Sequence, residues 1–165
     1  MNVEETLMTA SQILEGWAWK TETTRPAPTR IDATLENNDD LVPLVVALRV
    51  KHLGYLSAIT GLDHGPEAGF MEALYHFSSG PVIVTLRLKL PREGAVVPTL
   101  SDIIPSAEPF ERELAEMFGV TVVGLRAPDH LYLPEGWPEG VYPLRKDFDP
   151  GVLGGNGHHA EMDAW

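Results

Sequence analysis

Apolar and polar side chains alternate in three consecutive stretches in the middle of the chain. The clearest is VIVTLRLKL, residues 82–90, where every second residue is valine or leucine. Successive side chains of a strand point to opposite faces, so this stretch predicts a strand with one buried face. YLSAITGLDH (55–64) and FMEALYHF (70–77) are also typical of strands. The short connections between the three favour antiparallel hairpins.

Apolar residues three or four positions apart predict three helices, over residues 1–17, 37–54 and 106–119. Each helix begins beside residues that can cap its free N–H groups, namely Asn2 with Glu5, Asp39 or Asp40, and Ser106. Each also has a glycine at or near its C-terminal end, and for the third helix Gly119 can supply a left-handed turn.

The order of these elements predicts the fold class. An alternation at Ile31, Ala33 and Leu35 adds a half-buried strand after the first helix, and VTVVG (120–124) adds a short one after the third. This order favours an α+β two-layer sandwich, with a mixed or antiparallel sheet and helices on one face. We therefore expect an α+β domain over residues 1–124.

Prolines and glycines dominate residues 125–165, and no helix fits there. A long irregular segment beside a compact domain is usually functional or disordered. Its aromatic and aliphatic residues favour docking over disorder, because a disordered chain is poor in such side chains. We expect an extended docking tail over residues 125–165.

The charge balance narrows the classes of function. Asp and Glu number 24 against 12 Lys and Arg, which gives a net charge of −12. Binding to nucleic acid or to anionic lipid is disfavoured, because both require clustered positive charge. The chain has no cysteine and so cannot hold an iron–sulfur cluster through thiolates. The longest apolar run, residues 41–48, is far shorter than the ~20 residues of a membrane-spanning helix, and the N-terminus begins acidic. We expect a soluble, cytoplasmic chain.

The polar face of the third helix carries regularly spaced charges. Glu108, Arg112 and Glu116 recur every four residues, so the arginine has a carboxylate on either side. Glu111 and Glu113 have no such partner along the helix. The pattern fits a surface helix stabilised by its own ion pairs, and it also fits a charged face that meets the arginines of a partner.

GVYPLRKDFDP, residues 140–150, is an unusual basic stretch in an acidic chain. Arg145 offers a planar fork suited to bidentate carboxylate pairing, and Pro143 keeps the segment extended. Tyr142 and Phe148 can anchor it in pockets. Two interpretations stay open at this point: the segment docks on a neighbouring chain, or it folds back on its own domain.

Scattered histidines and carboxylates raise a third hypothesis, a free-standing metal-dependent enzyme. The candidate ligands are His64, Glu67, Glu72 and His76, with His158, His159, Glu161 and Asp163 in the tail. Their spacing selects neither a helix face nor a tight loop, so the pattern favours ordinary strand, turn and tail residues. No phosphate-binding loop or nucleophile motif is present.

Two of these motifs resemble the family of the 30 kDa subunit, or C-type subunit, of NADH:quinone oxidoreductase (respiratory complex I). ERELAEMFG (111–119) is similar to the family's E-R-E-x-x-D/E helix with its two apolar residues and glycine. PLRKDF (143–148) is similar to its P-L-R-K-D-F/Y segment, and Leu131, Leu133, Pro134 and Trp137 match a leucine-rich L-P-x-x-W element between them. The likeness is firm over residues 99–150.

The resemblance implies a non-catalytic, cofactor-free subunit in the hydrophilic arm of a membrane oxidoreductase, peripheral on the cytoplasmic side of the membrane. Its partners would be a subunit of the hydrogenase-large-subunit-like (D) type and a small iron–sulfur subunit of the B type. Those partners would hold the iron–sulfur clusters and the quinone or NiFe site. The implied interface comprises Glu111, Arg112, Glu113, Glu116, Phe118, Trp137, Tyr142, Pro143, Leu144, Arg145, Lys146, Asp147 and Phe148.

The chain departs from the family pattern in one place. Many members have a His-Pro pair where this chain has Leu125-Arg126. The residues before Pro143, GWPEGVY, also differ from the glycine–histidine sequence that is common there in NADH-oxidising complexes. Similar variants occur in the related membrane-bound [NiFe] hydrogenases and formate hydrogenlyases. We expect the quinone-reducing kind of complex, with the hydrogenase kind as the alternative, and the electron donor and acceptor are left open.

Overall fold

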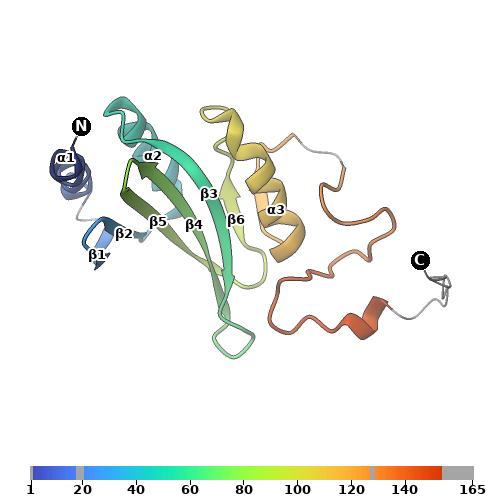
Figure 1. Ribbon diagram of the computed structural model, residues 1–165. Coiled ribbons are helices and arrows are strands. Elements are labelled where there is room, and N and C mark those ends of the chain that lie inside the picture. The colour runs from blue at the N-terminus through green and yellow to red at the C-terminus, as the bar shows by residue number, and fades with distance from the viewer. Residues whose placement is uncertain (1, 18–20, 127–128, 154–165) are drawn as a thin grey trace, which may run out of the picture.

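The protein is a two-layer α+β domain followed by an extended C-terminal tail (Figure 1). The structure is a computed structural model that describes residues 2–17, 21–126 and 129–153. A five-stranded sheet has the order β1-β2-β5-β4-β3, and its apolar face packs against the helices. The predicted fold class, a mixed sheet with helices on one face and a long tail, is confirmed.

The predicted three-strand meander is present. It consists of β3 (Tyr55–Asp63), β4 (Phe70–Ser79) and β5 (Val82–Pro91), paired antiparallel. The five alternating apolar residues of β5 are all buried. Burial of this stripe drives the strand to lie on the helices, because each buried aliphatic side chain contributes roughly 1.5–3 kcal/mol.

The predicted strand around Ile31 is β2 (Arg30–Leu35), which pairs parallel with β5. Its other neighbour, β1 (Thr21–Ala27), was not predicted, because TETTRPA is polar apart from one proline and one alanine. All but the first residue of β1 are exposed at the sheet edge. An edge strand of this kind tolerates proline and carries no hydrophobic alternation.

Two helices, which contact each other, precede the meander in the chain. α1 (Val3–Glu15) has the predicted capping box between Asn2 and Glu5. α2 (Leu41–Val50) follows a short 3-10 turn, Asn38–Asp40. Asp40 occupies the N-cap position of α2 as expected, but its side chain makes no capping bond there. None of the helices in the described part of the chain is long and apolar enough to cross a membrane.

The third helix, α3 (Glu108–Phe118), packs against β3. It starts after a 3-10 turn, Pro105–Ala107, so the prediction that Ser106 caps it is wrong: the backbone already turns before that position. Gly119 ends α3 with φ 72°, as predicted. The segments on either side of α3 form a small parallel sheet of β6 (Val96–Pro98), which was not predicted, and β7 (Thr121–Val123).

The core lies between the sheet and the three helices. Its fully buried side chains include Leu14 of α1, Leu44 and Leu48 of α2, Tyr75 and Phe77 of β4, and Leu86 and Leu88 of β5. The tail beyond β7 lies outside this core and runs on the far side of α3 (Figure 1). The division into residues 1–124 and 125–165 stays a prediction.

Gly119 allows the tail to approach α3 closely. A Cβ atom at this position would lie 2.4 Å from the Tyr142 ring, and the Leu144 N–H donates to the Met117 carbonyl 3.2 Å away. The missing side chain of Gly119 therefore makes room for the tail as well as permitting the left-handed turn.

We expect Gly119→Ala to lower the free energy of unfolding by about 2–4 kcal/mol, because it adds a clash to left-handed strain. Gly94 is the matched control, since its φ is 68° and no atom lies within 4 Å of a Cβ placed there. Gly94→Ala should cost only about 1 kcal/mol. Urea unfolding of both variants measures the difference, and equal losses would contradict the close packing of Tyr142 on Gly119.

Candidate functional site

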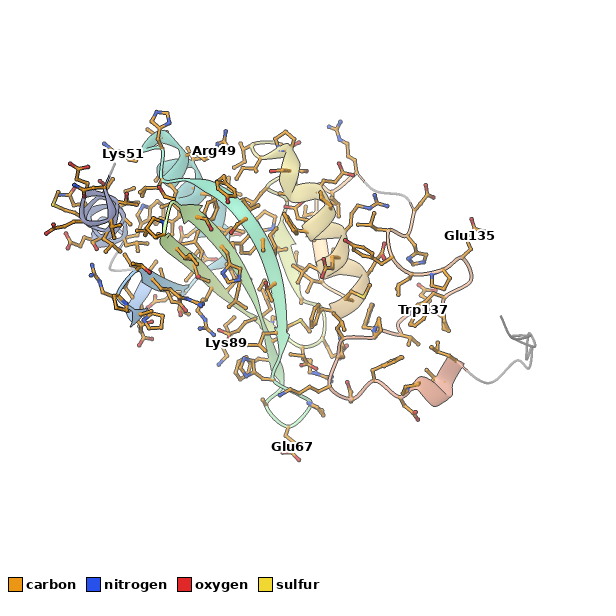
Figure 2. All side chains as sticks on the ribbon, viewed as in Figure 1. Arg49, Lys51, Glu67, Lys89, Glu135 and Trp137 are labelled. Atoms are coloured by element: carbon orange, nitrogen blue, oxygen red, sulfur yellow. The ribbon has the colours of Figure 1, made fainter. Side chains whose placement is uncertain are left out.

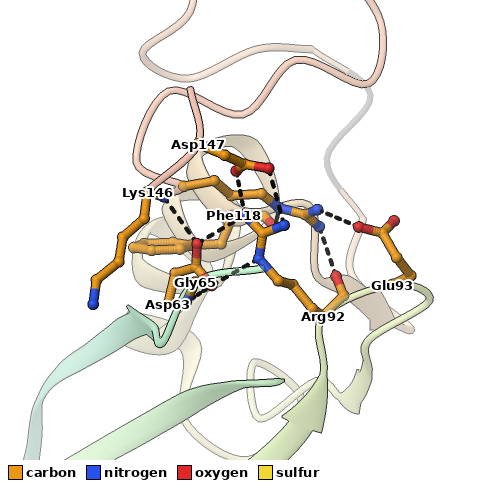
Figure 3. A network of polar contacts seen from close by, with 8 residues as sticks. Asp63, Gly65, Arg92, Glu93, Phe118, Lys146 and Asp147 are labelled. Atoms are coloured by element: carbon orange, nitrogen blue, oxygen red, sulfur yellow. Dashed lines mark hydrogen bonds and ion pairs between the residues drawn. The ribbon is translucent and has the colours of Figure 1, made fainter. Parts of the chain in front are cut away.

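An arginine held between two aspartates ties the tail to the sheet (Figure 3). Arg92, just after β5, donates Nε to Asp63 Oδ1 (2.9 Å) and Nη2 to Asp63 Oδ2 (3.0 Å) at the end of β3. The outer side of the same guanidinium binds both carboxylate oxygens of Asp147 in the tail. Two bidentate pairs on one arginine fix the position of the tail with directional, charge-assisted bonds.

Asp63 is the buried centre of this network. Its side chain is 1% exposed and that of Arg92 8%. Asp63 also accepts the backbone N–H groups of Gly65 (3.0 Å) and Lys146 (2.9 Å), so each carboxylate oxygen faces two donors. The hydrogen bonds from Arg92 hold the pKa of Asp63 well below its usual value, and they also lower the pKa of Asp147. Conversely, the two aspartates raise the pKa of Arg92.

Arg145 binds within its own chain. Its Nε donates to the Phe118 carbonyl (2.9 Å), Nη2 to the Arg92 carbonyl (3.0 Å) and Nη1 to Glu93 (2.9 Å). Its guanidinium also lies over the Tyr142 ring, 4.5 Å from the centroid. Of the two interpretations left open above, the intramolecular one describes the Arg145 side chain. Its guanidinium binds the Phe118 carbonyl at the C-terminal end of α3, and its carboxylate partner, Glu93, belongs to the same chain.

A second contact fixes the start of the tail on α3. The carboxylate of Glu116 accepts the consecutive backbone N–H groups of Leu131, Tyr132 and Leu133. Burial opposes the charge of Glu116, but these three donors hold its pKa below the usual value. Arg112 donates to the Asp129 carbonyl (2.8 Å) and lies 3.9 Å from Glu108. Part of the predicted charged helix face therefore serves to hold the tail.

Glu111 lies inside the domain, with an exposed fraction of 0%. Its carboxylate accepts the Thr99 hydroxyl (2.6 Å) and the Leu100 N–H, which fixes the loop between β6 and α3. Burial raises its pKa. The first glutamate of the helix motif is thus buried within its own domain, whereas Glu113 is half-buried, and their place in the implied interface stays a prediction.

The aromatic residues of the tail contact one another. The Trp137 and Phe148 rings stack with centroids 6.3 Å apart, and the Trp137 indole N–H donates to the Val141 carbonyl (2.7 Å). Apolar side chains nevertheless remain exposed along the tail. They are Leu131 (36%), Tyr132 (58%), Leu144 (52%), Val152 (53%) and Leu153 (40%). The tail is therefore fixed by polar contacts to its own domain and leaves a row of apolar side chains in solvent.

Of the candidate metal ligands that the structure describes, His64 and Glu72 lie together and His76 bonds elsewhere. His64 bonds Glu72 (2.8 Å) and His76 bonds Thr85 (3.1 Å), both on strands or beside them. Within residues 2–17, 21–126 and 129–153, no three His, Cys, Asp or Glu side chains are grouped to hold a metal ion. The other candidates, His158, His159, Glu161 and Asp163, lie outside the described residues.

Sequence reasoning missed Asp63, Arg92 and Glu93, which hold the basic tail segment. Little in the local pattern distinguishes them, because Asp63 and Arg92 lie at the ends of strands 29 residues apart, and their partners in the tail are 55 to 83 residues away. The only local signal is a pair of opposite charges, Arg92-Glu93, directly after the apolar alternation of β5.

We expect Asp63→Asn to lower the free energy of unfolding at pH 7 by about 3–5 kcal/mol, since it leaves Arg92 buried with one partner removed. The depressed pKa of Asp63 stabilises the fold above the unfolded-state pKa of about 4, and this contribution is lost as the pH falls below it. The variant should therefore lose less stability than the parent between pH 5 and about 3. Asp39→Asn, at an exposed position, is the control. Urea unfolding across this pH range that gave parallel curves for parent and Asp63→Asn would contradict the role of Asp63.

Comparison with known proteins shows which protein family the chain matches. The family model of the respiratory-chain NADH dehydrogenase 30 Kd subunit matches residues 35–151, more than half of the chain. The match includes α2, the meander, α3 and the anchored part of the tail.

Three curated relatives show how widely this module occurs. The chain is 40% identical to the membrane-bound hydrogenase subunit beta of Pyrococcus furiosus, over 52% of this chain and 50% of the relative. It is 34% identical to the C subunit of the NADH-quinone oxidoreductase of Ruegeria pomeroyi, over 72% of this chain and 58% of the relative. It is also 34% identical to the C/D subunit of the NADH-quinone oxidoreductase of Phocaeicola vulgatus, over 60% of this chain and 19% of the relative. In none of the three does the match reach two thirds of the relative's length.

A solved structure has the same fold over most of the chain. It is a chain of the membrane-bound sulfane sulfur reductase, an archaeal respiratory membrane complex, with a TM-score of 0.71 and 26% identity. The alignment covers 90% of this chain and 88% of that one. The fold, the two motifs and the family match agree, and the chain belongs to the family of the 30 Kd subunit of respiratory-chain NADH dehydrogenase.

Proposed function

We propose that this chain is a non-catalytic subunit of a complex-I-type membrane oxidoreductase, in which its tail holds a hydrogenase-large-subunit-like (D-type) neighbour in register. The single observation that carries the proposal is that the tail is fixed on its own domain while apolar side chains along it stay exposed. Arg92, Arg145 and Glu116 make the fixing contacts, and Tyr132, Leu144 and Val152 are exposed. A segment that is ordered before binding loses less conformational entropy when it docks.

The exposed row suits an interface with another subunit. Interfaces derive most of their binding free energy from a few apolar or aromatic side chains that are buried on binding. Tyr132 and Leu144 are 58% and 52% exposed although they lie on a well-anchored backbone. Burying them on a neighbour would contribute about 1–2 kcal/mol each by the area rule.

A D-type neighbour is favoured by the C/D relative. There the match covers only 19% of a chain whose name joins the two subunits. Fusion of the C and D parts in one chain is consistent with a contact between them when they are separate. In this proposal the iron–sulfur clusters, and the quinone or NiFe site, belong to the D-type and B-type neighbours, and this chain reaches the membrane only through them.

The second candidate function is the equivalent subunit of a hydrogenase-type complex. It is favoured by the 40% identity to the membrane-bound hydrogenase subunit beta, over about half of the chain. The scaffold role of the tail is the same in both, because it depends only on the anchored segment and the exposed apolar row. The sequence of the D-type neighbour separates the two: two C-x-x-C pairs for nickel indicate a hydrogenase, and their loss indicates quinone chemistry.

We expect Leu144→Asp to weaken assembly of the chain into its native complex by at least roughly 30-fold, because a charge would replace an apolar anchor at the interface. Ile83→Asp is the matched control, since Ile83 is 36% exposed but lies on the sheet, away from the tail. Affinity purification from cells that carry each variant, with the co-purifying subunits quantified by mass spectrometry, measures the loss.

Urea unfolding of both isolated variants separates a loss of folding from a loss of docking, and we expect Leu144→Asp to change the free energy of unfolding little, because Leu144 is 52% exposed. A Leu144→Asp chain that assembled as well as the parent would contradict the proposed docking face. So would the absence of the parent chain from any hydrophilic arm.

A further inference from the structure

The tail contains a pocket between two stretches that lie apart in the sequence. Its volume is about 440 Å³, and its walls include Pro134, Glu135, Trp137, Val152 and Leu153. Figure 2 shows Glu135 and Trp137 in this part of the tail, at the end of the molecule away from α1. None of the described hydrogen bonds between the tail and the domain involves these five residues, so anchoring of the tail does not explain this tail pocket.

Contacts within the tail hold the two walls of the tail pocket together. Trp137 of one wall stacks on Phe148, which shortly precedes the other wall, a 3-10 turn at Pro150–Leu153. That turn is closed by the Val152 N–H, which donates to the Asp149 carbonyl 3.2 Å away. The pocket is therefore already formed in the chain alone, and a group that enters it pays little entropy for ordering the walls.

The walls of the tail pocket are mainly apolar. Val152 and Leu153 are 53% and 40% exposed, and Trp137 is half-buried. Aromatic and aliphatic side chains around a concave site are the usual surroundings of an apolar anchor residue from a partner protein. The walls therefore favour a bulky apolar side chain as the occupant.

The charges beside the tail pocket are negative. Glu135 lines it, Glu139 directly follows the lining residue Pro138, and Asp149 closes the turn that carries Val152. All three acidic residues are exposed. None of them forms an ion pair with another residue that the structure describes.

The basic residues of this part of the chain are placed elsewhere. Residues 129–153 contain one arginine, Arg145, and one lysine, Lys146. Arg145 binds the Phe118 carbonyl at the end of α3, and the Lys146 side chain lies against the β3–β4 hairpin, 3.6 Å from a Cβ placed on Gly65. An apolar pocket thus stands beside three carboxylates for which the described residues provide no counter-ion.

We propose that the tail pocket receives a bulky apolar side chain from a neighbouring subunit, and that lysines or arginines next to that side chain pair with Glu135, Glu139 and Asp149. A leucine, methionine or phenylalanine flanked by basic residues fits both features. The inference deepens the proposed function and rests on it, because the neighbour is a subunit of the same complex. It adds to the apolar row a contact whose charge distinguishes one partner from another.

The same charges disfavour other occupants. A second copy of the chain would bring its own net charge of −12, and anionic lipid or nucleic acid would bring phosphates, so each would be repelled. The chain's own residues 154–165 contain Glu161 and Asp163 but no lysine or arginine. A basic segment of another subunit is the protein partner that meets no such repulsion.

Site-specific photo-crosslinking in the native complex tests the proposal. The photoreactive residue p-benzoylphenylalanine replaces Val152 in one strain, Leu144 in a second, and the exposed Thr24 of β1 in a control strain. We expect Val152 to yield a cross-link to a segment of another subunit in which an apolar residue adjoins lysine or arginine. Thr24 should yield no cross-link to that segment.

A double charge reversal tests the role of the carboxylates. Glu135→Lys combined with Glu139→Lys should reduce the Val152 cross-link, relative to the Leu144 cross-link, about tenfold or more, because like charges then meet at the contact. Glu22→Lys combined with Glu36→Lys is the matched control. It changes the net charge by the same amount at two exposed positions outside the tail, and the ratio of the two cross-links should stay as in the parent.

The outcomes separate this inference from the proposed function. Cross-links from Leu144 but none from Val152 would overturn the tail pocket and leave the docking tail intact. Cross-links from neither position would contradict both. A Val152 cross-link that is insensitive to the double charge reversal would rule out the basic partner. So would a Val152 cross-link to residues 154–165 of the same chain, or one that joins ¹⁴N- and ¹⁵N-labelled copies of the chain.

Discussion

The position of the tail depends on Arg92, which joins two strand ends and the tail through Asp63 and Asp147. Burying such an ion pair carries a large desolvation free energy, which is offset only when both partners are fully hydrogen-bonded. Asp63 meets this condition, since it binds the Arg92 fork and two backbone N–H groups. Because one of those N–H groups belongs to Lys146, the same carboxylate holds both the arginine and the tail backbone. Arg145 and Glu116 then add contacts to a segment already placed.

This arrangement changes the meaning of the charged motif residues. A basic pair in an acidic chain suggests a docking charge, yet Arg145 is used to bind the Phe118 and Arg92 carbonyls of its own domain. Glu111 and Glu116 likewise hold internal backbone groups. The polar motif residues thus shape and orient the tail, and the surface that we propose for a neighbour consists of the apolar residues between them. Binding to a neighbour should therefore depend on Leu144 and Tyr132 more than on the charges.

Periodicity predicted the helices, the meander and the buried face of β5, because these features repeat within a few residues. The capping box of α1 and the left-handed Gly119 also depend on residues close together in the sequence, and both predictions are confirmed. β1 was missed because an exposed edge strand carries no hydrophobic alternation, and β6 because its three residues, VVP, end in a proline and show no alternation. Asp63 and Arg92 were missed for a different reason. Their function arises from the meeting of distant segments, and the one local signal, the opposite charges of Arg92-Glu93 after β5, does not identify their partners.

We infer that the tail is ordered on its own domain before any partner binds. Amide hydrogen exchange on the isolated chain tests it most directly, because the N–H groups of Leu144, Lys146 and Phe148 are all hydrogen-bonded within the chain. We predict that these three amides exchange slowly in the isolated chain at neutral pH, and that Asp63→Asn makes them exchange fast while the amides of β4 stay protected. Exchange of residues 142–148 at the rate of an unstructured peptide, with slow exchange only in the assembled complex, would contradict it.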